Sequence, residues 1–154
     1  MKKINNLFVL GLIIVGLFVI TGCGKSNYDE YMGYQYTGKD PWENKLAITI
    51  SKLEGDKLTW VFTDVIGEGE KSITLYNELK TKFKDGKTSF NIKGDAENNN
   101  SFDYSGTLEF KDGKVLVKYE KGQLTMNSSE GGSSSYNVGA LDNSKKIITL
   151  TKVS

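Results

Sequence analysis

Apolar and polar residues alternate along most of the chain between residues 46 and 150, and this alternation restricts the possible folds more than any other feature. Leu58, Trp60 and Phe62, for example, are separated by Thr59 and Val61. A period of two is typical of a half-buried β-strand, because successive side chains point to opposite faces. The spacing recurs in six further segments: Leu46, Ile48 and Ile50; Ile73 and Leu75; Phe90 and Ile92; Phe102, Tyr104, Leu108 and Phe110; Val115, Val117 and Tyr119; and Ile148 and Leu150. The sequence therefore predicts an all-β protein.

Turn signals separate these segments. The motif "FKDGK" occurs at 83–87 and again at 110–114. Asp-Gly favours a type I′ turn, because both central residues of that turn need a positive φ. "LEGDKL" (53–58) and "IGEGE" (66–70) predict two further tight turns, and "MNSSEGGSSSYNV" (126–138) predicts a flexible hairpin tip or loop. Consecutive strands should therefore pair with each other.

These hairpins predict a single domain over residues 28–154, built as an antiparallel meander of about eight to ten strands. Such a sheet either leaves two edges or closes on itself, and closure removes the edges. We therefore expect a closed or nearly closed small barrel, with a β-sandwich as the alternative. Side chains such as Trp60, Phe62 and Tyr104 would point into its interior.

The first 22 residues have a different character. Lys2 and Lys3 precede an apolar run of 14 residues, from 7 to 20. A membrane-spanning helix needs about 20 apolar residues, whereas a secretory signal has an apolar core of roughly 7 to 15 with a positive segment before it. The run predicts a signal peptide.

The segment "ITGC" (20–23) resembles the lipobox of bacterial lipoproteins, although Ile20 and Thr21 are less common variants of that pattern. The resemblance implies cleavage between Gly22 and Cys23 and a diacylglyceryl group on the Cys23 thiol. Two acyl chains hold a protein stably at a membrane. We therefore expect residues 1–22 to be removed, residues 23–27 to form a lipidated tether, and the domain to lie on the extracytoplasmic side of a bacterial cell membrane.

Composition narrows the function. The chain has 20 lysines, no arginine, no histidine and 19 acidic residues, and Cys23 is its single cysteine. Removing the signal peptide removes two lysines, which leaves a net charge of −1. Near-neutral charge without arginine argues against a nucleic-acid partner. The lack of histidine removes the commonest general base and metal ligand. We expect a non-catalytic protein with no metal and no cofactor.

The opening of the domain, "NYDEYMGYQY" (27–36), is similar to the opening of lipocalins, in which an Asp, an aromatic residue and a Gly precede a Trp that closes the barrel floor. Asp29, Tyr31 and Gly33 match this order, but Gln35 stands where the Trp is expected. The resemblance implies a barrel with an internal ligand cavity, and Trp42 is a substitute candidate for the floor residue.

Aromatic side chains are the candidate ligand contacts, because tyrosine and tryptophan combine a flat apolar body with a polar tip. The candidates are Tyr34, Tyr36, Trp42, Trp60, Phe62 and Tyr104. The expected function is binding of an apolar or aromatic ligand inside the barrel. The alternative is a module with a solid core that binds an envelope protein or a glycan through its surface.

The sequence also contains two less favoured candidate sites, one for calcium and one for acid catalysis. Asp95, Glu97 and Asn99 have the first spacings of a calcium loop, but the glycine and glutamate that should follow are missing. Asp64 continues the inward phase of Trp60 and Phe62, so it is the carboxylate expected to be buried. An acid pair of Asp64 with Glu68, Glu70 or Glu78 is the one catalytic arrangement that the sequence suggests.

Overall fold

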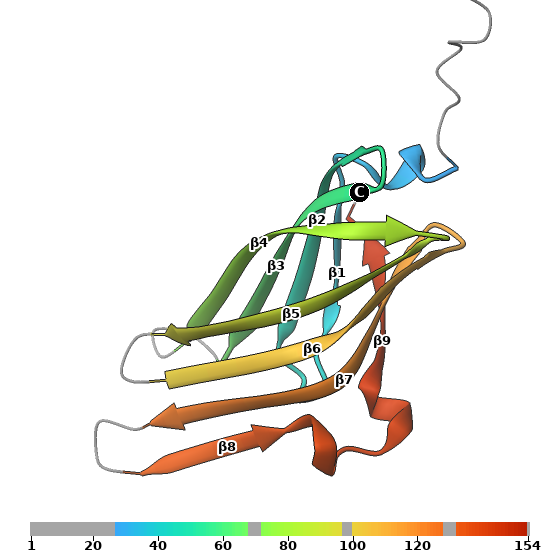
Figure 1. Ribbon diagram of the computed structural model, residues 1–154. Coiled ribbons are helices and arrows are strands. Elements are labelled where there is room, and N and C mark those ends of the chain that lie inside the picture. The colour runs from blue at the N-terminus through green and yellow to red at the C-terminus, as the bar shows by residue number, and fades with distance from the viewer. Residues whose placement is uncertain (1–26, 68–71, 97–99, 128–131, 154) are drawn as a thin grey trace, which may run out of the picture.

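In a computed structural model of the chain, the described residues are 27–67, 72–96, 100–127 and 132–153, and they form an antiparallel β-barrel (Figure 1). The strands are β1 Gln35–Lys39, β2 Lys45–Glu54, β3 Lys57–Ile66, β4 Ile73–Lys84, β5 Lys87–Ala96, β6 Asn100–Lys111, β7 Lys114–Asn127, β8 Ser133–Asn137 and β9 Ile147–Lys152. Short 3₁₀ helices are η1 Asp29–Tyr31, η3 Val138–Ala140 and η4 Asn143–Lys146. No helix among the described residues is long and apolar enough to cross a membrane.

The barrel closes through eight strands, and β8 lies outside the ring. Strands β1 to β7 follow one another around the barrel, and β9 joins β7 to β1. β8 pairs with the last part of β7, where Gln123 lies opposite Asn137. The expected closed barrel is confirmed, and the β-sandwich alternative is wrong. The hairpin predicted at 126–138 is formed by the end of β7 and by β8, where Asn127 pairs with Ser133, and its tip lies outside the described residues.

The length of β7 explains why one strand leaves the ring. Its first part pairs with β9 from Val115 to Lys118, and its last part pairs with β8 from Gln123 to Asn127. A β-bulge at Ser105 and Gly106 shifts the β6–β7 register between these two parts. One edge of β7 is therefore long enough for two partners in succession.

The Asp-Gly turns have the predicted backbone. Asp85 and Gly86 have φ values of 52° and 75°, and Asp112 and Gly113 have values of 53° and 70°. Positive φ at both central residues is the type I′ pattern. The turn predicted within 66–70 extends beyond the described residues.

The end of the barrel where η1 and the last residues of β9 lie is called here the upper end (Figure 1). Aromatic side chains close this end. The Tyr31 ring contacts the Phe110 ring with centroids 5.0 Å apart, and the Tyr28 ring contacts that of Phe83 at 4.9 Å. The Tyr31 hydroxyl accepts a 2.9 Å hydrogen bond from the backbone N–H of Gly113. These contacts fix η1 across the upper end.

Strands β4 and β5 separate below the upper end. In the described residues they pair at Phe83 with Thr88 and at Lys84 with Lys87, whereas β3 and β4 pair along their whole length. Between the upper end and the lower end, where β3, β5 and β7 end, a gap separates the ribbons of β4 and β5 (Figure 1). Side chains of the barrel interior therefore come closest to solvent between these two strands.

Candidate functional site

A buried carboxyl group lies in the lower half of the barrel. Asp64 follows Trp60 and Phe62 in the inward phase of β3, and only 1 % of its surface is exposed. The predicted burial of Asp64 is confirmed. Neither of its carboxyl oxygens has a hydrogen-bond partner among the described residues. Buried polar groups are nearly always hydrogen-bonded, so this exception requires an explanation.

Two further polar groups share this situation. The Tyr104 hydroxyl on β6 and the Asn77 side-chain nitrogen on β4 are buried and have no hydrogen-bond partner in the described part of the chain. Asn77 lies directly across from Phe62 in the β3–β4 register, one inward position from Asp64. We call Asp64, Asn77 and Tyr104 the lower-end site. It offers two carboxyl oxygens, a hydroxyl and an amide N–H₂.

A second buried carboxylate, Asp40, borders the lower-end site, but its hydrogen bonds are made. Its oxygens accept bonds from the backbone N–H groups of Trp42 and Asn44, at 2.8 and 2.7 Å, and from the Asn44 side chain at 2.9 Å. These bonds hold the loop from β1 to β2 across the lower end. Asp40 therefore has a structural role that Asp64 lacks.

Burial and charge act together on these groups. Removal from water, and then the negative charge of Asp40, raise the pKa of Asp64 to about 8. Burial also raises the pKa of the Tyr104 hydroxyl, and the neighbouring Asp64 raises it further. The same causes raise the pKa of Tyr119. At neutral pH the site is therefore mostly protonated while it is empty.

Aromatic rings surround the lower-end site. The Tyr104 ring lies 6.4 Å from the rings of both Trp42 and Phe62 and 5.7 Å from that of Tyr119, measured between centroids. Trp42 also contacts Tyr136 of β8 at 5.6 Å, which places it at the lower end, as expected for a floor residue. The walls of the site are thus flat and apolar, and its polar groups are few.

A hollow of about 600 Å³ opens between β4 and β5 beside the site. Its wall includes Leu75 and Asn77 from β4, Gly94 from β5 and Phe102 from β6. Leu75 is the cross-strand partner of Asp64. A side chain at position 94 would collide with the Phe102 ring, since an added Cβ would lie 2.7 Å from it. We call this space the β4–β5 hollow.

The candidate ligand contacts fall into separate groups. Trp42, Phe62 and Tyr104 come together at the lower-end site. Trp60 lies in the core and donates a 2.8 Å hydrogen bond from Nε1 to the Thr81 hydroxyl. Tyr36 is buried at the upper end, 5.9 Å from the Tyr31 ring.

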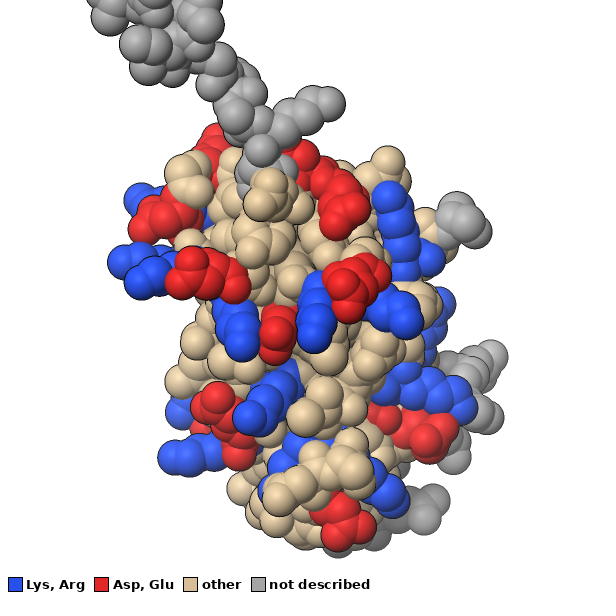
Figure 2. Space-filling model, turned by 90° about the vertical axis from the view of Figure 1, so that its right-hand side faces the viewer, with Lys and Arg blue, Asp and Glu red and all other residues tan. Residues whose placement is uncertain are grey.

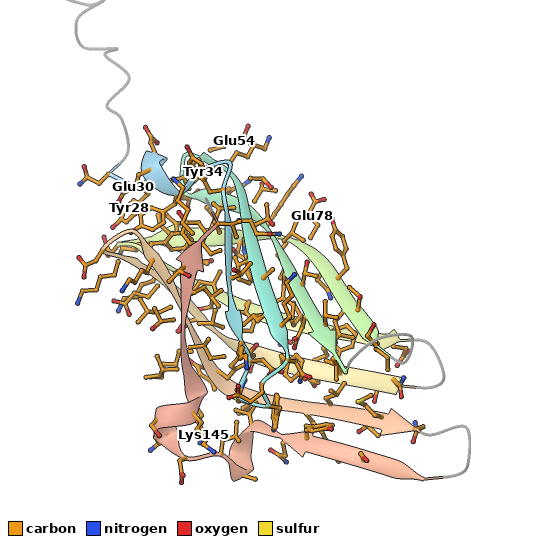
Figure 3. The ribbon with its side chains drawn as sticks, turned by 180° about the vertical axis from the view of Figure 1, so that it is seen from behind. Tyr28, Glu30, Tyr34, Glu54, Glu78 and Lys145 are labelled. Atoms are coloured by element: carbon orange, nitrogen blue, oxygen red, sulfur yellow. The ribbon has the colours of Figure 1, made fainter. Side chains whose placement is uncertain are left out.

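Tyr34 lies apart from all of these. Its ring is 43 % exposed at the upper end, near Tyr28 (Figure 3), and the Lys152 Nζ lies 3.0 Å from the ring centroid. It contacts neither the lower-end site nor the core cluster among the described residues. The sequence places Tyr34 two residues from Tyr36, but the strand begins between them and separates their environments.

Sequence reasoning missed Asn77 and Asp40. Asn77 follows Ile73 and Leu75 in the inward phase of β4, so the alternation itself carried the signal. Asp40 begins the polar loop after β1, where the sequence gives no sign that the loop folds under the barrel. A polar residue on an otherwise apolar face is the feature that would have identified Asn77.

The other predicted sites lie on the outer surface or outside the described residues. Glu78 lies on the outer face of β4 and points away from the barrel (Figure 3). The described residues contain no group of three or more acidic, histidine or cysteine side chains that could hold a metal ion. Gly22, Cys23, Glu68, Glu70, Glu97 and Asn99 lie outside the described residues.

The outer surface carries mixed charge. Lysines and acidic residues are interspersed over the side that contains β9 (Figure 2). Exposed pairs such as Lys93 with Asp103, at 2.8 Å, neutralise each other locally. Pairs of this kind contribute little stability, and they leave no concentrated field on the strands that carry them.

Comparison of the chain with protein-family models, with curated proteins and with solved structures gives no match.

Proposed function

We propose that this protein is a lipid-anchored, non-catalytic binding protein of a bacterial envelope, and that its barrel holds a small ligand at the lower end. The observation that carries the proposal is the lower-end site. The Asp64 carboxyl oxygens, the Asn77 side-chain nitrogen and the Tyr104 hydroxyl are buried atoms without hydrogen-bond partners among the described residues, and Asn77 lies one inward position from Asp64 in the β3–β4 register. Leaving such groups unpaired costs about 1 to 3 kcal/mol each, and a bound ligand would supply the missing partners.

The arrangement of the interior supports a ligand of limited size. Above the site, the Phe90 ring packs against those of Trp60 and Tyr119, with centroids 6.0 Å from each. Side chains of the protein thus occupy the middle of the barrel. The β4–β5 hollow of about 600 Å³ lies within the range of small-molecule sites.

The position of the first described residues supports the proposed anchoring. Residues 27 and 28 lie at the upper end, which Tyr28 and Tyr31 close (Figure 1). A tether from a lipidated Cys23 would therefore hold the closed end towards the membrane. The β4–β5 hollow would lie at the opposite end, accessible from the aqueous side.

A binding role also suits the chemistry of the site better than catalysis. Among the described residues, the acid whose charge acts on Asp64 is Asp40, whose oxygens are already engaged by Trp42 and Asn44. Acid–base catalysis needs a second group free to exchange a proton with the substrate. In the proposed role, Asp64 and Tyr104 would hold a ligand between aromatic rings.

Native mass spectrometry of the lipidated protein, extracted gently from its membrane, tests this function. We expect a reproducible added mass that disappears on denaturation and that is absent from Asp64→Asn. The Glu78→Gln protein, which loses an exposed carboxylate, should retain the added mass. A bare mass for the wild type, together with ordered water alone at Asp64 in a crystal structure, would contradict the proposal.

The second candidate is an interaction module with a solid core. The tightly packed upper half favours it, as do Tyr34 and Tyr76, which are 43 % and 64 % exposed. Exposed aromatic residues are common at protein interfaces. Replacing both by serine should abolish capture of a crosslinked envelope partner without lowering the melting temperature, and unchanged capture would exclude this role.

A further inference from the structure

We infer that the lower-end site binds a small primary amine that also carries an oxygen acceptor, with Asp64 as the counter-ion of the ammonium group. The inference rests on the proposed binding function and specifies its ligand. It follows from the charge of the site, from its unused hydrogen-bonding groups, from its aromatic walls and from the route by which a ligand would enter.

The charges around the site favour a cation. Asp40 is the charged group that acts on Asp64, and both are carboxyls. Lys93, the lysine that lines the β4–β5 hollow, is paired with Asp103 at 2.8 Å. Asp95 also lines the hollow. A ligand approaching Asp64 therefore meets acidic groups and a lysine whose charge is already balanced.

The unused hydrogen-bonding groups define the rest of the ligand. Asp64 provides acceptor oxygens, and the Tyr104 hydroxyl can also accept. A primary ammonium group has three N–H donors, which suits these acceptors. Asn77 offers an N–H donor and needs an acceptor in return. An amine with a hydroxyl or carbonyl oxygen a few bonds away satisfies all three residues.

The aromatic walls suit the same ligand. Trp42, Phe62 and Tyr119 surround Tyr104 with ring centroids 5.7 to 6.4 Å from its own. A cation within about 6 Å of an aromatic face is attracted to the ring, most strongly where water is excluded. The rings also give apolar contact to the carbon skeleton of an amine.

The β4–β5 hollow provides the route. Asn77 belongs both to the wall of the hollow and to the site, and Leu75 on the same wall faces Asp64 across the strands. β4 and β5 pair near the upper end. Among the described residues, their backbones are not paired beside the hollow. A slender ligand would enter between these two strands and pass Asn77 and Leu75 to reach Asp64.

Binding of an ammonium ion must displace a proton. Burial raises the pKa of Asp64 to about 8, so the empty site holds its proton at pH 7. Within the described part of the chain, the titratable groups coupled to it are Asp40, Tyr104 and Tyr119, and the pKa values of both tyrosines are raised well above 10. Asp64 itself is therefore the group that releases a proton when a cation pairs with it.

Isothermal titration calorimetry on the full lipidated protein in detergent micelles tests the inference. The probes are tyramine and ethanolamine, and their uncharged counterparts are tyrosol and ethylene glycol. Titrations at pH 7 in phosphate and in MOPS buffer give the number of protons released. We expect at least one amine to bind more than tenfold more tightly than its counterpart, with release of close to one proton.

Variants assign the effect to the site. Asp64→Asn should weaken amine binding at least tenfold and abolish proton release. Tyr104→Phe should weaken amine binding severalfold, but binding should still release a proton. Glu78→Gln should behave as the wild type. Thermal unfolding shows whether each variant is folded. If Asp64→Asn does not fold, Tyr104→Phe serves as the test.

Three results would overturn the amine assignment: equal binding of amines and neutral counterparts, amine binding that Asp64→Asn leaves unchanged, or no binding of either amine. Native mass spectrometry then separates the two proposals. A neutral compound bound in an Asp64-dependent way would keep the binding function and remove the amine. A protein without any ligand would remove both.

Discussion

A carboxyl group buried without hydrogen-bond partners destabilises a folded protein, and Asp64 is such a group within the described part of the chain. Replacement by an apolar residue of similar size would relieve this cost. The barrel instead holds Asp64 at 1 % exposure, where its charge acts on Tyr104 and its cross-strand partner Leu75 lines the β4–β5 hollow. A cost of this kind is typical of residues kept for function.

The first prediction concerns the stability of the empty protein as a function of pH. The pKa of Asp64 rises from 3.8 to about 8 on folding. Its contribution to stability is therefore fully present below about pH 4 and is lost as the pH rises towards 8. Asp64→Asn cannot titrate, so the difference in unfolding free energy between wild type and variant should change by up to about 1.4 kcal/mol per pH unit in this window.

Urea unfolding at several pH values measures this difference. Asp56→Asn is the matched control, because Asp56 is an exposed carboxylate near the β2–β3 turn. Its difference from the wild type should stay nearly constant over the same range. A wild type and an Asp64→Asn protein with parallel pH profiles would show that Asp64 has an ordinary pKa.

The second prediction concerns Tyr31 at the upper end. Its hydroxyl accepts the 2.9 Å bond from Gly113, which lies in the β6–β7 turn. Tyr31→Phe keeps the ring contacts but leaves that N–H without this partner, so it should lower the unfolding free energy by about 1 kcal/mol. Tyr34→Phe, which removes the hydroxyl of an exposed ring, should have almost no effect in the same denaturation experiment. Equal effects of the two changes would refute a role for this bond.

At the scale of elements, the pairing of β4 with β5 is the weak part of the ring. Below Phe83 and Thr88, hydrogen bonds between side chains take the place of the ladder. The Thr88 hydroxyl lies 2.6 Å from that of Thr81, which in turn accepts the Trp60 N–H. A short chain of side-chain bonds thus connects β3, β4 and β5 where backbone pairing stops.

The third prediction tests this connection. Thr88→Val preserves the shape of the buried side chain but removes its hydrogen bond, so it should cost about 1 to 2 kcal/mol of stability. Backbone amides of β4 and β5 should then exchange with deuterium faster than those of β6 and β7. Thr149→Val on the exposed face of β9 is the control and should change neither quantity. Uniform acceleration over all strands would argue against a local role.

The hairpins were predictable because their signals are local. Asp85–Gly86 and Asp112–Gly113 determine turn type without help from distant residues, and alternation determines which side chains point inward. The position of β8 was not predictable in this way. Ser133 to Ser135 carry no apolar pattern, and their pairing depends on how far β7 extends beyond β9.

The site was predictable in part for the same reason. The phase of β3 predicted that Asp64 is buried, and aromatic composition identified Trp42, Phe62 and Tyr104. The missing partners of Asp64 and Tyr104 could not be predicted, because they depend on which strands meet across the barrel. The separation of β4 from β5, which forms the hollow, also depends on closure of the whole ring.

For the whole molecule, the proposed lipid anchor leads to a fourth prediction. Cys23→Ser removes the thiol that would carry the diacylglyceryl group. The variant should then be absent from the membrane fraction as a mature protein, and it should carry no labelled fatty acid. Ser26→Ala, a similar small change in the expected tether, should leave both properties as they are. Fractionation and labelling with a radioactive fatty acid measure them. Fatty-acid labelling of Cys23→Ser would contradict the anchor.

The pairing of β1 with β9 determines when the barrel can be completed. Tyr36 lies opposite Lys152. The free edge of β1, near the start of the domain, is therefore paired by β9, which is the last strand to be synthesised. During synthesis, β1 emerges early and has β2 alone as a neighbour until β9 follows. Formation of the ring is therefore a late event, and a nascent chain stopped before Ile147 would expose the open edges of β1 and β7 to proteases and to other chains.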